Sequence, residues 1–119
     1  MPHEFVLDAI AEVRPTTRAM FGALAVYVGE KIVFLLRDRP DDPQANGVWL
    51  AILTEFQESL RAEFPNTGTV RVMGKDISGW RLLAVDADDF EASALHACEL
   101  VVRNDPRIGK VPNKKRTTT

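Results

Sequence analysis

The stretch Arg18-Ala19-Met20-Phe21-Gly22 and the two apolar runs that follow it, 24–28 and 32–36, decide the fold. Both runs have the length of a β-strand, and side chains in the first run alternate between two faces. Gly29-Glu30 separates the runs, and a two-residue connection that starts with glycine is typical of a type II′ hairpin. We therefore predict a meander of three short strands over residues 17–37.

The second run is apolar on both faces of its predicted strand. Ile32, Phe34 and Leu36 would line one face, and Val33 and Leu35 would line the other. Such a strand needs cover on both sides, and one layer of helices covers only one of them. The sequence therefore predicts that the second face is covered by another layer or by a partner subunit.

Apolar periodicity predicts the remaining elements. We expect helices over 3–14 and 55–64, a long helix that ends before Asp105-Pro106, strands over 69–73 and 80–85, and a possible strand over 48–52. Thr54-x-x-Gln57 and Asp88-x-x-Glu91 have the form of helix capping boxes, and residues 74–79 are expected to form a turn. Because strands and helices do not alternate strictly, a parallel sheet is disfavoured. The predicted fold class is α+β, a two-layer arrangement of a mostly antiparallel sheet with helices packed on it, in the order α-β-β-β-(β)-α-β-β-α.

Length and composition fit one domain. The chain has 119 residues, of which 45% are apolar and 27% charged, and a chain of this length buries roughly two thirds of its unfolded surface on folding. We predict one domain over residues 1–109 and a basic, flexible tail over 110–119. No apolar run approaches the ~20 residues that cross a bilayer, the first residues do not form a signal peptide, and Cys98 is the only cysteine. We expect a cytoplasmic protein without membrane contact.

Charge is distributed unevenly along the chain. The formal net charge of -2 includes Lys110, Lys114, Lys115 and Arg116, so residues 1–109 carry about -6. An acidic body repels a phosphate backbone, so nucleic acid contact is possible only through the four cations of the tail. The alternative, which we favour, is that the tail is a solvated end that aids solubility.

The residue types that carry catalysis do not converge in this sequence. His96 and Cys98 lie two positions apart on the predicted last helix, so they point in different directions and cannot share a metal ion. Cys98 falls in the apolar stripe of that helix and is expected to be a core thiol. The acidic cluster over residues 86–91 is better explained by the electrostatics of a helix N-terminus than by acid–base chemistry. We predict that the protein is not an enzyme and uses no metal or cofactor.

The pattern Arg18-x-Met20-Phe21-Gly22, with Tyr27 in the next strand and Gly29 at the turn, resembles the start of the TfoX N-terminal domain family. These are small proteins and domains related to the bacterial competence regulator TfoX (Sxy). Later segments are similar to stand-alone members of that group, namely Gly79-Trp80, Asp89-Phe90-Glu91 and Asp105-Pro106-Arg107-Ile108-Gly109. The resemblance covers roughly residues 3–110. It implies a two-layer α+β fold and no established catalytic residues.

Six residues are candidates for a ligand or partner surface: Arg18, Met20, Phe21, Tyr27, Trp80 and Arg107. Each also has a structural interpretation. The adjacent methionine and phenylalanine fit core or sheet packing, and Arg18 can pair with an acid on a neighbouring strand or offer its guanidinium to an anion or partner. Trp80 fits a core position as well as an interface. Arg107 is expected to form a local pair with Asp105, with a recognition surface as the alternative.

Three functions remain open at this point. The first is a non-enzymatic binding or regulatory domain that works by protein–protein contact, with a homodimer as the expected assembly. The second is a small-molecule or anion-binding domain with a pocket near Arg18, Tyr27 and Trp80. The third is a DNA-associated regulator that uses the basic C-terminal tail.

Overall fold

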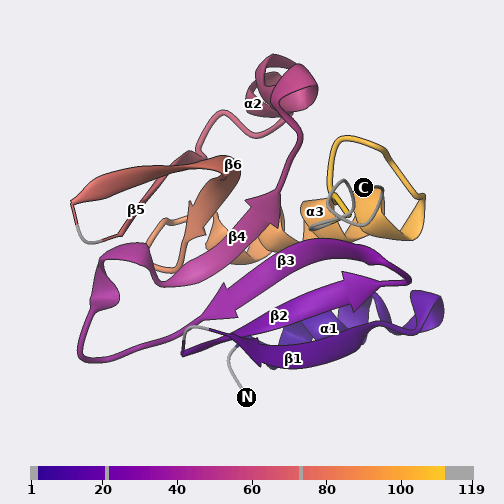
Figure 1. The fold of residues 1–119 in the computed structure, drawn as a ribbon, viewed down its shortest axis with the longest axis horizontal. Coiled ribbons are helices and arrows are strands. Elements are labelled where there is room, and N and C mark those ends of the chain that lie inside the picture. The colour runs from indigo at the N-terminus through magenta and orange to yellow at the C-terminus, as the bar shows by residue number, and fades with distance from the viewer. Residues whose placement is uncertain (1–2, 21, 73, 112–119) are drawn as a thin grey trace, which may run out of the picture.

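The structure, a computed structural model, describes residues 3–20, 22–72 and 74–111. These residues form a six-stranded sheet in the order β1-β2-β3-β4-β6-β5, and each pair of neighbouring strands is antiparallel (Figure 1). The strands are β1 (Thr16–Met20), β2 (Ala23–Val28), β3 (Lys31–Arg37), β4 (Gly47–Ala51), β5 (Gly68–Val72) and β6 (Lys75–Ala84). The predicted α+β class is confirmed, and the possible strand before the second helix is present as β4.

The helices of the described chain are α1 (Glu4–Ala9), α2 (Gln57–Glu63) and α3 (Phe90–Val102), with short 3-10 helices η1 (Ala11–Val13), η2 (Pro43–Ala45) and η3 (Thr54–Phe56). The predicted helix over 3–14 is thus divided into α1 and η1. Figure 1 shows α1 and α3 on the same side of the sheet, whereas α2 lies at one end of it, beyond the end of β4. None of the described helices has the length and apolar character that crossing a bilayer requires.

The larger core fills the space between the sheet and the helices. Val26, Phe34 and Leu50 from three strands meet Val6 of α1 and Leu100 of α3, and all five side chains are fully buried. Full burial of a large aliphatic or aromatic side chain contributes roughly 1.5–3 kcal/mol. This core therefore holds α1 and α3 on the sheet.

The second face of the sheet is also apolar, and it is buried within the chain. Its cluster consists of Ala23, Ala25, Ile32, Leu35, Ala45, Trp49, Ala51, Val70 and Leu82, none more than 8% exposed. Ala45 belongs to η2 and Val70 to β5, two segments that lie in contact. The Trp49 indole nitrogen donates a hydrogen bond of 2.8 Å to the Ala45 carbonyl oxygen. The chain's own strands and loop thus cover the face for which the sequence predicted another layer or a partner.

One strand departs from the predicted alternation. The β2–β3 register shifts between Val26 and Tyr27, whose partners are Phe34 and Ile32, so Val33 is the extra residue of a β-bulge. Val33 joins Phe34 in the helix-side core, and Ile32 belongs to the opposite cluster. The prediction that Ile32 shares a face with Phe34 is wrong, because an inserted residue reverses the alternation on one side of the bulge.

The predicted caps and one predicted turn also differ from the structure. The N-cap of α2 is Phe56 and that of α3 is Asp89, and neither helix start has a side-chain cap hydrogen bond. The capping boxes predicted from Thr54 and Asp88 are therefore wrong. The segment 74–79 is not a turn throughout, because β6 already begins at Lys75.

The chain returns to the sheet after α3. The Ile108 side chain is buried, and the Gly109 N–H donates to the Ala51 carbonyl oxygen over 2.7 Å. Lys110 and Ile32 exchange two backbone hydrogen bonds of 2.9 and 3.0 Å. Lys110, the first residue of the predicted tail, is therefore attached to β3.

Candidate functional site

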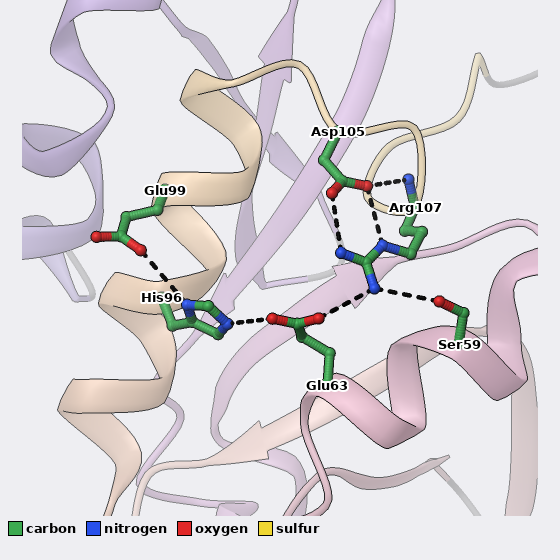
Figure 2. A network of polar contacts seen from close by, with 6 residues as sticks. All are labelled: Ser59, Glu63, His96, Glu99, Asp105 and Arg107. Carbon is green, nitrogen blue, oxygen red and sulfur yellow. Dashed lines mark hydrogen bonds and ion pairs between the residues drawn. The ribbon is translucent and has the colours of Figure 1, made fainter.

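A network of polar side chains connects α2, α3 and the segment that follows α3 (Figure 2). Its centre is a two-pronged pair in which Arg107 Nε donates to Asp105 Oδ1 over 3.0 Å and Arg107 Nη2 donates to Asp105 Oδ2 over 2.9 Å. The backbone N–H of Arg107 also donates to Asp105 Oδ1 over 2.9 Å. The predicted local pair is confirmed. The planar guanidinium matches the carboxylate in this geometry, which a lysine cannot reproduce.

The network continues from the remaining guanidinium nitrogen. Arg107 Nη1 donates to Ser59 Oγ and to Glu63 Oε1, each over 3.1 Å. The other carboxylate oxygen of Glu63 lies 2.7 Å from His96 Nε2, and His96 Nδ1 lies 3.4 Å from Glu99 Oε1. Glu63 therefore bridges the segment after α3 to α3 itself, as Figure 2 shows.

These contacts set the charge state of the network. The hydrogen bond from Arg107 lowers the pKa of Asp105 to about 2. Hydrogen bonds from His96 and then from Arg107 lower the pKa of Glu63, and the two carboxylates, with Asp105 as the larger cause, raise that of Arg107. Hydrogen bonding to the charged form of a group stabilises that form. Both carboxylates are therefore ionised at neutral pH, and the network holds fixed charges.

The chemistry available to this network is limited. Both ring nitrogens of His96 face carboxylates, and its ring lies 4.9 Å from the Phe64 ring between centroids. Ser59 is engaged with Arg107. Within the described ranges no hydroxyl or thiol forms a hydrogen bond with His96, so a nucleophile paired with a base is missing there. The arrangement fastens α2, α3 and the following segment together.

Three of the predicted surface residues gather at the β1–β2 hairpin. The Arg18 guanidinium carbon lies 5.6 Å from the centroid of the Tyr27 ring, a cation–π distance. Met20 and Tyr27 are half-buried against the second-face cluster. The aromatic ring on the neighbouring strand thus takes the place of the acid that the sequence suggested as the partner of Arg18.

Trp80 lies elsewhere, near the C-terminal segment. Its ring meets that of Trp49 edge-on with 5.8 Å between centroids, and Lys110 Nζ lies 4.9 Å above it. The same ammonium donates to the Gly79 carbonyl oxygen over 3.0 Å, and burial lowers its pKa. Because Lys110 is engaged within the fold, its charge is not presented freely to a phosphate backbone.

The predicted candidates are therefore not one site. Arg18, Met20 and Tyr27 share the β1–β2 hairpin, Trp80 lies with Lys110, and Arg107 belongs to the polar network. Four predicted residues lie outside the described part of the chain: Phe21, Lys114, Lys115 and Arg116.

Cys98 is a core thiol, as predicted. Its side chain is buried, its sulfur lies 3.7 Å from the Val6 carbonyl oxygen, and burial raises its pKa to about 12. A thiol in this state stays protonated and is a poor nucleophile. Among the described residues, no group of three or more His, Cys, Asp or Glu side chains is placed to hold a metal ion.

The sequence did not reveal that Ser59, Glu63 and His96 belong to the network. Ser59 and Glu63 lie on α2, and His96 lies 33 positions after Glu63. The only local signal was the spacing of His96 and Glu99, which places them on one side of a helix. The contact between α2 and α3 arises from tertiary packing, so no short-range pattern could reveal it.

The two outer strands of the sheet form a second kind of candidate surface. Among the described strands, β1 is bonded only to β2, and its residues 16–19 are exposed. Its pairing with β2 is regular over all five residues. β5, the other outer strand, has a register shift between Thr69 and Val70 and carries an exposed Arg71–Asp76 ion pair of 3.4 Å. Bulges and charges protect an edge against further pairing, so β1 is the more open edge.

Comparison with known proteins found no matching family model, no matching curated protein and no matching solved structure.

Proposed function

We propose that this chain is a non-enzymatic binding module of the cytoplasm, related to the TfoX N-terminal domain family, that acts by protein–protein contact through the edge of β1. The observation that carries the proposal is the exposed, regular edge of that strand. An outer strand presents unpaired N–H and C=O groups, and adding a partner strand to such an edge is a common mode of protein recognition.

The burial of the second face restricts where contact can occur. Ile32 and Leu35 of β3 are 4% and 3% exposed, so this apolar face does not offer the surface that first motivated a dimer. Association through strand pairing at β1 needs no opening of either core. The proposed contact therefore adds to the fold without rearranging it.

The proposed occupant is a second copy of the chain, which gives a homodimer. Symmetric pairing of two antiparallel β1 strands places one residue opposite itself. If Arg18 were that residue, the two copies of Arg18 would place like charges opposite each other, which is destabilising. With Thr17 opposite Thr17, each Arg18 lies opposite Thr16 of the other copy. We therefore propose the register centred on Thr17.

The assignment as a non-enzyme is supported by the chemistry of the described residues. Cys98 is buried and its pKa is raised to about 12. His96 faces a carboxylate on each side. Neither residue is arranged as a nucleophile with a base.

The test compares matched substitutions on the two outer strands. Thr17→Lys places two ammonium groups opposite each other in the proposed dimer, whereas Thr69→Lys makes the same change at an exposed position of β5. Size-exclusion chromatography with light scattering should give twice the chain mass of 13.3 kDa for the wild type and Thr69→Lys. Thr17→Lys should weaken association by up to about fivefold, as expected when like charges oppose each other.

Two outcomes would count against the proposal. A wild-type mass of one chain at every concentration would remove the dimer. Equal weakening by Thr17→Lys and Thr69→Lys would remove β1 as its site.

A further inference from the structure

A hollow of about 400 Å³ lies between α2 and the β5–β6 hairpin. Arg61 of α2 and Arg81 of β6 line it, together with Thr67 from the connection between α2 and β5. The hollow is separate from the β1 edge, so what it binds does not depend on the proposed dimer.

Neither guanidinium in this hollow has an acidic partner. In the described part of the chain, no Asp or Glu oxygen forms an ion pair within 4.0 Å of Arg61 or Arg81. Arg71 and Arg107, in contrast, pair with Asp76 and Asp105. The hollow thus brings together two positive charges that form no ion pair with the described residues.

Hydrogen bonds to Thr67 hold the Arg81 guanidinium in place but do not occupy all of its N–H donors. Its Nη2 donates to the Thr67 carbonyl oxygen over 2.9 Å, and its Nε and Nη2 both lie 3.2 Å from Thr67 Oγ1. Its Nη1 has no hydrogen-bond partner among the described residues, and since no buried side-chain nitrogen of this part of the chain is unsatisfied, Nη1 is open to solvent. A fixed guanidinium with a free donor is prepared to bind an acceptor, because little conformational entropy is lost.

The electrostatics of the hollow favour an anion. Burial, and then the charge of Arg61, lowers the pKa of Arg81. Two like charges close together are stabilised by any negative group that enters between them. Glu58 also lines the hollow and opposes an anion, so its carboxylate limits the affinity.

We propose that the hollow between α2 and the β5–β6 hairpin binds an oxyanion, the phosphate or carboxylate group of a small ligand, through Arg61 and Arg81, with Thr67 holding the Arg81 guanidinium in position. Guanidinium groups form strong paired hydrogen bonds with both kinds of oxyanion. Phe64 and Pro65 line the same hollow and give the rest of such a ligand an apolar wall. Inorganic phosphate and succinate serve as probes that distinguish a phosphate ligand from a carboxylate ligand.

The test is a titration of the full-length chain followed by amide NMR, with inorganic phosphate and succinate as probes and sodium chloride at matched ionic strength. We expect saturable shifts of amides over 61–67 and at Arg81 with phosphate, with succinate or with both. Saturation by phosphate alone identifies a phosphate ligand, and saturation by succinate alone identifies a carboxylate ligand. No saturable shift with either probe, or equal shifts with sodium chloride, would overturn the proposal.

Substitutions assign the binding to named residues. Arg61→Gln should weaken binding about tenfold, in line with the loss of a charged hydrogen bond, whereas Glu58→Gln should tighten it. Arg71→Gln removes the same charge from a position on β5 that does not line the hollow, and it should leave binding unchanged. Arg81→Gln should abolish binding. If this variant does not fold, the opposite effects of Arg61→Gln and Glu58→Gln, at two exposed positions of α2, still test the proposal. Equal weakening by Arg61→Gln and Arg71→Gln would contradict a specific site.

Discussion

Asp105 and Arg107 lie two residues apart on either side of Pro106 and form the two-pronged ion pair of the polar network. Their side chains are only 16% and 20% exposed, so water screens them less than it screens an ordinary surface pair. The local half of the network was predictable from sequence, because its partners are neighbours along the chain. Glu63 and His96 were not, since helix packing alone brings them together.

Replacing Asp105 should reveal a pH-dependent contribution to stability. The pKa of Asp105 falls from 3.8 to about 2 on folding. A lowered pKa stabilises the fold above the unfolded value, and the contribution is lost as the pH drops through the folded value. Asp105→Asn should therefore cost roughly 1–2 kcal/mol at neutral pH, measured by urea unfolding. The difference from wild type should shrink as the pH falls from about 4 toward about 2.

Asp86→Asn is the matched control for this effect. Asp86 is exposed and forms no ion pair within the described residues. This substitution should leave the free energy of unfolding nearly unchanged at both ends of the range. A pH-independent loss in Asp105→Asn would mean that packing, and not charge, explains its effect.

At the scale of the elements, the alternation of side chains predicted the two faces of some strands correctly and those of β3 only in part. Leu24 and Val26 share one face of β2, and Trp80 and Leu82 share one face of β6, as their alternation in the sequence indicated. In these parts β2 pairs regularly with β3 and β6 pairs regularly with β4, so the period of two is preserved. The faces of β3 were predicted incorrectly before Phe34, because the bulge depends on how β3 pairs with β2.

The loop that joins β3 to β4 should depend on Asn46. This buried side chain accepts from Arg37 Nη1 over 3.1 Å and from the Arg39 N–H over 2.9 Å, and it donates to the Arg39 carbonyl oxygen. Asn46→Ala leaves the buried Arg37 guanidinium short of an acceptor, which we expect to cost about 2–3 kcal/mol. Urea unfolding measures the loss, and hydrogen exchange should show faster exchange of the Arg39 amide.

Gln44→Ala provides the control in the same loop. Gln44 is exposed, and its side chain forms no hydrogen bond among the described residues. Its substitution should change stability by less than about 0.5 kcal/mol. Similar losses in Gln44→Ala and Asn46→Ala would show that the loop is not held by the Asn46 contacts.

At the scale of the whole molecule, the sequence predicted that both faces of the sheet need cover but not what covers the second. Val70 and Ala45 lie 25 positions apart and meet only because β5 and η2 lie in contact. Nothing in either local segment indicates that contact. Apolar side chains on both faces of a strand indicate that both faces must be buried. The topology determines which segment covers each face.

The segment after α3 should be required for the fold as a whole. Ile108 fills a buried position, and the backbones of Gly109 and Lys110 bond to Ala51 of β4 and Ile32 of β3. A chain that ends at Arg107 loses these contacts, whereas a chain that ends at Val111 keeps them. Loss of a buried isoleucine side chain alone costs about 2–5 kcal/mol, so the shorter chain should unfold at much lower urea concentration or fail to fold.

The comparison between the two truncated chains isolates residues 108–111, because both lack the same residues after Val111. Ile108→Ala in the full-length chain separates the side chain from the backbone contacts, and it should account for about half or more of the loss. If both truncated chains unfold at the same urea concentration, the pairing with β3 and β4 contributes nothing measurable. If Ile108→Ala is neutral while the shorter chain is destabilised, the backbone hydrogen bonds alone attach the C-terminal segment to the sheet.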